Sequence, residues 1–232
     1  MKLLGVIGGV SPESTQIYYR LLNEAARARA GGEHSARILL YALDYGVMIR
    51  HYQARDWDAF KREVALGAEH LAKGGAEAIV ISSNTTHIAA DAAATASGLP
   101  VVHMLDALTA VMDRAGARKP LLLGTPVVMG GDYYRPALAA RYDGDVLVPD
   151  AGEQEEIGRI ILDELVNGEV KDASRRTLLD IVNRRREEGV DGVILGCTEL
   201  CMILDQSHTD LSVFDTTAIH VEAAAAFAFG EA

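Results

Sequence analysis

Short apolar runs alternate with longer segments of helical periodicity along almost the whole chain. The runs end in glycine or small polar residues, and the longer segments begin with helix-start signals such as Ser11-Pro12. Strands are expected at residues 2–7, 36–43, 76–81, 100–104, 120–124 and 191–195, and helices at 11–31, 57–74, 105–115, 133–141, 153–167, 173–189 and 216–229. Neighbouring parallel strands need a long connection between them, most often a helix. The alternation therefore predicts an α/β fold with mainly parallel strands.

An internal repeat indicates that the chain has two similar halves. Residues 75–85 match residues 189–199, which aligns Ser83 with Cys197 at an offset of 114, and residues 6–9 match residues 122–125 at an offset of 116. Buried strands can resemble one another by chance, but two matches at nearly one offset, half of the 232-residue length, favour a duplicated α/β unit. We therefore expect two pseudo-symmetric domains, 1–102 plus 209–232 and 103–208, with the strand Val213-Phe214 in the first.

Composition excludes several classes of protein. The chain has 33 acidic and 22 basic residues, a net charge of −11, so nucleic acid is not an expected partner. No apolar run is long enough to span a membrane, and the N-terminus lacks the layout of a secretory signal, so no membrane partner is expected. The only two cysteines are Cys197 and Cys201, which rules out a disulfide framework and favours a cytoplasmic protein with reduced thiols.

Polar residues follow four of the expected strands, at the positions where an open α/β sheet binds its ligands. These residues are Val10-Ser11, residues 83–87, Thr125 and residues 197–199. Each group precedes an expected helix, whose N-terminal N–H groups attract anions, and Asn84, Thr85 and Thr198 add neutral donors. Any one threonine is explained as a helix cap, but four groups at one edge favour a site for a small carboxylate.

Cys197 is the strongest candidate for a reactive group. It lies between a buried strand and an expected helix, where the helix dipole should lower the pKa of its thiol and supply a thiolate base or nucleophile. Cys201, one helical turn later, is interpreted as a small buried hydrophobe. The sequence has no G-x-G-x-x-G or P-loop motif, no lysine Schiff-base pattern and no Cys/His metal spacing, so no cofactor and no metal are expected.

The motifs IGGVSPEST, NTTH, LLGT, GVILGCTEL and VFDTTAIH together resemble the aspartate/glutamate racemase family over nearly the whole chain. The resemblance implies two similar α/β domains with the site in the cleft between them. It also implies cofactor-independent racemisation of acidic amino acids by two bases on opposite faces of the α-carbon, and a homodimer. Residues implied to act in catalysis are Cys197 and Ser83, and those implied to bind substrate are Val10, Tyr52, Asn84, Thr85, Thr125, Glu164 and Thr198.

The sequence departs from the family pattern at three positions. Ser83 stands where the family commonly has a second cysteine. Met48 and Glu164 stand where related aspartate racemases have basic residues for the distal carboxylate, and Arg50 is the nearest cation in the loop expected after the second strand. The enzyme could therefore be a racemase biased to one enantiomer. A one-base isomerase or decarboxylase of carboxylates using Cys197 and a non-catalytic carboxylate-binding protein are the alternatives.

Overall fold

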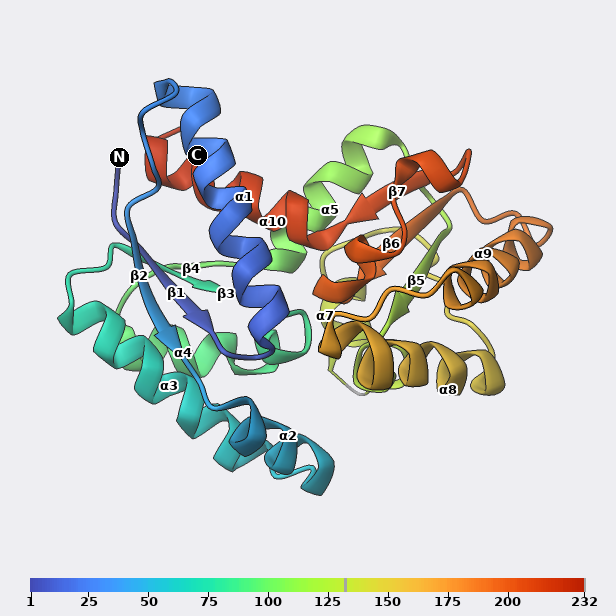
Figure 1. Ribbon diagram of the computed structural model, residues 1–232, viewed down its shortest axis with the longest axis horizontal. Helices are drawn as coiled ribbons and strands as arrows, with labels where there is room; N and C mark the ends of the chain where they lie inside the picture. The colour runs from blue at the N-terminus through green and yellow to red at the C-terminus, as the bar shows by residue number, and fades with distance from the viewer. Residues whose placement is uncertain (132, 232) are drawn as a thin grey trace. The chain divides into compact units, whose positions relative to one another are not determined.

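Two parallel sheets hold the strands of the protein (Figure 1). The computed structural model describes residues 1–131 and 133–231, and these contain seven strands. The first sheet has the order β2-β1-β3-β4 and the second β5-β6-β7. The strands are β1 (Leu4–Gly8), β2 (Ile38–Ala42), β3 (Ala78–Ile81), β4 (Val101–Val102), β5 (Pro120–Gly124), β6 (Gly192–Gly196) and β7 (Ser212–Asp215). The expected α/β fold with parallel sheets is confirmed.

The chain divides into two compact units, one around each sheet. The first unit is Met1–His103 together with the chain from His220, and the second is Met104–Ile219. Helices of the first unit are α1 (Pro12–Ala30), α2 (Tyr45–Ala54), α3 (Trp57–Lys73), the 3₁₀ helix η1 (Thr85–Ala89), α4 (Ala90–Ser97) and most of α10 (Thr216–Phe229). Helices of the second are α5 (Met104–Ala115), α6 (Pro126–Gly130), α7 (Tyr134–Ala139), α8 (Ala151–Arg159), the π-helical turn η2 (Ile160–Glu164), α9 (Asp172–Arg186) and the 3₁₀ helices η3 (Leu165–Asn167), η4 (Thr198–Met202) and η5 (Gln206–His208).

Each sheet packs its two faces against different helices. In the second unit Leu121, Leu123 and Leu195 contribute to the hydrophobic cluster with α8 and α9, whereas Leu122 and Ile194 pack with α5 and α7. This alternation follows from the period of two in a strand, and it explains why the strands are apolar without interruption. In the first unit α3 and α4 cover one face, while α1 and α10 lie on the other (Figure 1).

The strand registers agree with the internal repeat. Ile7 of β1 lies opposite Ile81 of β3, and Leu123 of β5 lies opposite Leu195 of β6. These are the pairs that the alignment of the two halves makes equivalent. Ser83, two residues after Ile81, and Cys197, two residues after Leu195, therefore occupy matching positions in the two units.

The expectation that Val213-Phe214 would join the first domain is wrong. These residues form β7, which pairs in parallel with β6 of the second sheet, as β4 pairs with β3 in the first. Parallel pairing with β6 supplies partners for an edge that would otherwise be open. The ring of Phe214 also packs closely over Gly192, where an added Cβ would come within 2.6 Å of it. The chain rejoins the first unit only at His220, inside α10.

Several elements were not expected from the sequence, among them α2, α4 and a bridge at Leu147. Asp44 caps α2 by accepting from the Val47 N–H, so Arg50 and Tyr52 lie on a helix rather than in a loop. Leu147 exchanges backbone hydrogen bonds with Pro120 and Leu122 at the free edge of β5, in the place that β2 occupies beside β1. Short segments such as these carry too little periodicity to be recognised.

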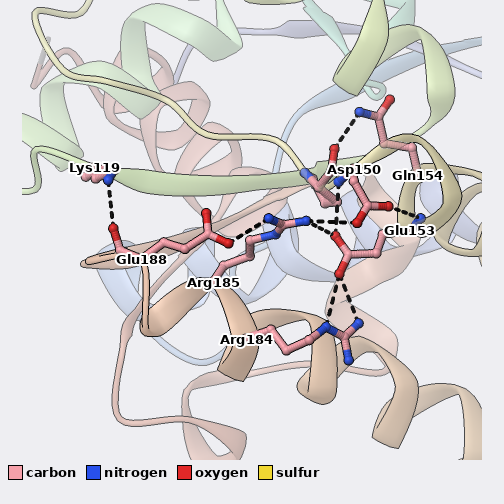
Figure 2. A network of polar contacts seen from close by, with 8 residues as sticks. Lys119, Asp150, Glu153, Gln154, Arg184, Arg185 and Glu188 are labelled. Carbon is pink, nitrogen blue, oxygen red and sulfur yellow. Dashed lines mark hydrogen bonds and ion pairs between the residues drawn. The ribbon is translucent and has the colours of Figure 1, made fainter.

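A network of charged residues ties α9 to the start of α8 (Figure 2). Arg184 and Arg185 both donate to the Glu153 carboxylate, and Glu153 completes a capping box with Asp150. Lys119, the residue before β5, donates to the Glu188 carbonyl at the end of the same network. These contacts link the last turn of α9 to the starts of α8 and β5.

Among residues 1–131 and 133–231, no helix combines the length and the apolar character needed to cross a bilayer.

Candidate active site

Cys197 follows β6 directly and forms a compact polar cluster with the next two residues. Its side chain is buried, with 7% of the residue exposed, and the thiol donates to Glu199 Oε2 across 3.0 Å. Thr198 Oγ1 donates to the same oxygen across 2.7 Å. Glu199 is itself only 4% exposed, so a thiol and a carboxylate share a site shielded from water. This arrangement can pass a proton from sulfur to oxygen over one hydrogen bond.

The surroundings of Cys197 raise the pKa of its thiol well above the ordinary value, so the expectation of a lowered pKa is wrong. Burial is the largest cause, followed by the negative charge of Glu199 and its hydrogen bond to the thiol. The following helix, η4, is a 3₁₀ helix of five residues, too short to outweigh these effects with its dipole. The thiol is therefore protonated at neutral pH.

Thr125 lies beside this cluster at the same edge of the second sheet. It follows Gly124, which is the register partner of Gly196, so Thr125 and Cys197 leave adjacent strands at the same level. The Thr125 side chain accepts from the Val128 N–H across 3.4 Å and caps α6. The structure thus brings Thr125, Cys197 and Thr198 together, and it gives Thr125 a capping contact as well.

Ser83 occupies the matching position after β3, in the first unit. Its hydroxyl accepts from the Thr86 N–H across 3.2 Å, and its carbonyl accepts a hydrogen bond from His87 Nδ1 across 2.7 Å. Asn84, 98% buried, and Thr85 follow at the start of η1. Because the Thr86 bond occupies a lone pair of Ser83 Oγ, the hydroxyl hydrogen is left for donation.

Val10 and Tyr52 border one hydrophobic cluster of the first unit. Both pack against the cluster that includes Ile7 and Ile81, and Tyr52 also meets the Trp57 ring edge to face at 6.0 Å between centroids. Met48 belongs to the same cluster and is 3% exposed. The side chain at position 48 is thus part of the core, while Arg50 lies exposed on α2.

Glu164 is held by protein groups of the second unit. It ends η2, is 4% exposed, and accepts from Ser174 Oγ at 2.6 Å and Arg159 Nη1 at 2.7 Å, with Lys171 Nζ at 3.7 Å. The hydrogen bond from Ser174 is the main cause that lowers the pKa of this carboxyl, and burial opposes it. Contact with a substrate at Glu164 stays a prediction.

A group of three histidines and a tyrosine adjoins Ser83 through His87, and the sequence did not indicate it. Tyr18, His87 and His220 are buried, and His103 is half-buried. Tyr18 OH lies 2.8 Å from His220 Nδ1, and His220 Nε2 lies 2.6 Å from the Val102 carbonyl oxygen. The His87 ring meets the rings of His220 and His103 edge to face, at 5.3 and 5.0 Å between centroids. Burial lowers the pKa of His220 to about 4, so this ring is neutral at pH 7.

Within residues 1–131 and 133–231, no three His, Cys, Asp or Glu side chains are grouped so that they could hold a metal ion.

Comparison with known proteins adds to this geometry. A protein of known structure from Yersinia pestis, assigned as a candidate Asp/Glu racemase, is 38% identical and superposes with a TM-score of 0.91, covering 99% of this chain and 100% of that one. PH1733 from Pyrococcus horikoshii OT3, an aspartate racemase homologue, is 33% identical with a TM-score of 0.86 over 99% and 100% of the two chains.

A relative of lower sequence identity is also an amino-acid racemase. The broad specificity amino-acid racemase RacX of Bacillus subtilis (strain 168) is 21% identical over 220 residues, which are 93% of each protein. The sequence pattern of one family matches residues 7–224 and so includes Val10, Ser83 and Cys197. The chain therefore belongs to the Asp/Glu/Hydantoin racemase family, a family of isomerases.

Proposed function

We propose that the protein is a cofactor-independent racemase of acidic amino acids, aspartate or glutamate, with Cys197 as its principal base and Ser83 in the place of the second. The observation that carries the proposal is the buried hydrogen bond from the Cys197 thiol to the Glu199 carboxylate at the end of β6. Family membership supports the reaction class, and the names of the relatives from Yersinia pestis and Pyrococcus horikoshii support acidic substrates.

The reaction begins with two proton transfers at Cys197. The thiol passes its proton to Glu199, and the thiolate then takes the α-proton of the substrate. The Cα–H bond breaks, an S–H bond forms, and the electron pair moves into the substrate carboxylate as an enediolate. The α-proton is a very weak acid, so neutral donors on that carboxylate are needed to stabilise the developing charge. Thr125 at the same sheet edge, and Asn84 and Thr85 in the first unit, are proposed for this role. Thr198 joins them once Glu199 is protonated and no longer accepts the Thr198 hydroxyl hydrogen.

Inversion is completed when a proton is added from the opposite face, which we assign to Ser83. The alkoxide left on Ser83 then takes a proton from solvent, and Glu199 returns its proton to solvent, so that both groups are reset for the next turnover. Its hydroxyl hydrogen is oriented for donation by the bond that Oγ accepts from Thr86. A hydroxyl is both a weaker acid and a weaker base than a thiol, so we expect transfer at Ser83 to be slower than transfer at Cys197.

The difference in proton-transfer rate between Cys197 and Ser83 predicts a specific kinetic result. Enantiomers have equal free energy, so kcat/KM must be the same in both directions, and the bias cannot appear there. It appears instead as exchange of the α-proton with solvent that exceeds inversion for the enantiomer whose α-proton meets Cys197.

Proton NMR of L- and D-aspartate and of L- and D-glutamate in D₂O, with chiral chromatography of the same samples, tests the proposal. Exchange with inversion supports the racemase. Exchange without inversion favours the one-base isomerase or decarboxylase, for which the capping contact of Ser83 is the specific observation. No exchange with any amino acid supports the carboxylate-binding protein. Lysine and alanine should be included, because Met48 is part of the core and Glu164 carries a negative charge.

The proposal includes a cytoplasmic homodimer that needs no cofactor. Both cysteines are free thiols, as expected for a reducing compartment. Activity should survive dialysis against a chelator without added pyridoxal phosphate, and light scattering after gel filtration should give twice the mass of one chain.

A further inference from the structure

The carbonyl of Ser83 is satisfied in an unusual way. At the start of an α-helix this oxygen would accept from the N–H four residues later, and in a 3₁₀ helix from the N–H three residues later. Here the Thr86 N–H goes to Ser83 Oγ, and the His87 N–H goes to the Asn84 carbonyl. The oxygen accepts instead from the side chain of His87, at 2.7 Å.

This contact defines the tautomer of His87. A carbonyl oxygen can only accept, so His87 Nδ1 carries the hydrogen. The ring is 1% exposed and is held on its other side by His220 and His103. His220 is fixed in turn, because its Nε2–H donates to the Val102 carbonyl and its Nδ1 accepts from Tyr18. The donor that holds Ser83 is therefore fixed by buried packing.

The second unit shows what the ring replaces. Cys201 stands 114 residues after His87, the same offset that relates Cys197 to Ser83. There the Cys197 carbonyl accepts from the backbone N–H of Leu200 at 3.1 Å, and the Cys201 thiol lies 3.1 Å from the Thr198 carbonyl. The carbonyl of Cys197 is thus held by a backbone N–H, whereas the carbonyl of Ser83 depends on a side chain.

We propose that His87 is a positioning residue for proton transfer at Ser83. The inference rests on the proposed racemase function and extends it to a residue that touches no substrate. With the Ile81 carbonyl accepting from the Ser83 N–H, Thr86 holding Oγ and His87 holding the carbonyl, three contacts fix the direction of the hydroxyl. Loss of the His87 contact leaves the other two and allows the peptide that follows Ser83 to rotate.

The test compares His87→Asn with His87→Gln. The amide nitrogen of asparagine can occupy the place of Nδ1, and this chain already has such a contact, from Asn23 Nδ2 to the Tyr19 carbonyl four residues earlier at 2.7 Å. The amide of glutamine corresponds to Nε2 instead. Both variants are polar and neutral, so they differ mainly in where they place the donor. Inversion and α-proton exchange are measured for each enantiomer in D₂O, with thermal unfolding as the control for stability.

We expect His87→Gln to slow inversion by about 10- to 100-fold and His87→Asn by about threefold or less, because small displacements of a reacting group are costly. Exchange that begins at Cys197 should stay within about threefold of wild type in both variants, because Ser83 takes no part in that step. Equal inversion rates in the two variants would overturn the inference. So would a parallel loss of exchange and inversion.

Two control variants separate positioning from packing. Cys201→Ala removes the counterpart of His87 and should change neither rate. Tyr18→Phe removes one buried hydrogen bond of the same cluster without touching Ser83, and it should lower stability while preserving the ratio of inversion to exchange. A change of that ratio in Tyr18→Phe as large as in His87→Gln would overturn a specific role for His87. If wild type shows neither exchange nor inversion, the proposed function fails first and the inference falls with it.

Discussion

The two strand ends that carry Ser83 and Cys197 occupy matching positions in their units and have opposite chemistry. Each follows the strand that pairs with the first strand of its unit, and each leads into a five-residue 3₁₀ helix. After Ser83 the side chain of His87 donates a hydrogen bond to the Ser83 carbonyl, and no carboxylate is close in sequence. After Cys197 the carboxylate of Glu199 accepts a hydrogen bond from the thiol. The two units thus place a reactive group at the same position of the fold, but the Ser83 hydroxyl and the Cys197 thiol differ in proton affinity.

The largest expected effect comes from removing the thiol. Cys197→Ala should reduce α-proton exchange and inversion by about 10³-fold or more, because no other group in the proposed site replaces a thiolate base. Exchange measured by NMR in D₂O checks this, with Cys201→Ala as the matched cysteine variant that should stay active. Exchange at the wild-type rate in Cys197→Ala would move the principal base elsewhere.

A smaller effect is expected at the carboxylate that distinguishes the two strand ends. Glu199→Gln removes the proton acceptor and should slow exchange by about 10- to 100-fold. It also removes a negative charge that raises the pKa of Cys197, so that pKa should fall, although burial still holds it up. The rate of alkylation by iodoacetamide as a function of pH, in the Cys201→Ala background, should therefore shift to lower pH.

Glu153→Gln provides the control for that shift, since it removes a carboxylate from the same unit at the network shown in Figure 2. The alkylation profile of Cys197 should not move in this variant. A profile that is unchanged in Glu199→Gln as well would mean that burial alone sets the reactivity of the thiol.

Making the two strand ends chemically alike tests the comparison directly. Ser83→Cys should raise inversion relative to exchange by about tenfold, because a thiol transfers protons more readily than a hydroxyl at neutral pH. The swap is nearly isosteric, and stability should change little. An unchanged ratio, combined with loss of activity in Cys197→Ala, would favour the one-base reaction.

The smallest expected effect is a change in stability at low pH. It arises from a difference between α5 and α10, the helices that follow the last strand of each sheet. Helices α5 and α10 begin at Met104 and Thr216, which aligns His220 of α10 with the buried Leu108 of α5. The folded pKa of His220 lies near 4, below its unfolded value of about 6.5, so the unfolded state binds more protons between these values. His220 should therefore cost about 1 kcal/mol of unfolding free energy as pH falls from about 7 to 5.5.

Urea unfolding at several pH values checks this. His220→Leu introduces the residue found at the equivalent position 108 of α5. Between pH 7 and 5.5 this variant should lose less unfolding free energy than wild type, by about 1 kcal/mol. Because the two units can unfold separately, the transition should be followed with a probe in the first unit. Equal slopes in wild type and variant would show that other groups titrate there.

Local signals in the sequence were sufficient for most elements and for the correspondence of the two strand ends. Ser11-Pro12 predicted the start of α1, and the repeat aligned Ser83 with Cys197 as the strand registers do. The features that the sequence did not predict correctly are those that depend on tertiary structure. The pKa of Cys197 is set by burial, which a strand-end motif does not reveal, and the histidine cluster joins residues 18, 87, 103 and 220, which no local pattern connects.

Both ends of the chain build the first unit, and this affects the order in which the protein can fold during synthesis. The Lys2 N–H donates to the Ala228 carbonyl across 2.8 Å, and Arg29 pairs with Glu222 and Glu231. The second unit is continuous, Met104–Ile219, and can fold while the ribosome is still adding the rest of α10. The first unit, although made first, must wait for the last helix. A circular permutant that joins the neighbouring termini and opens the chain in an exposed loop of the second unit would make the first unit continuous and reverse this delay.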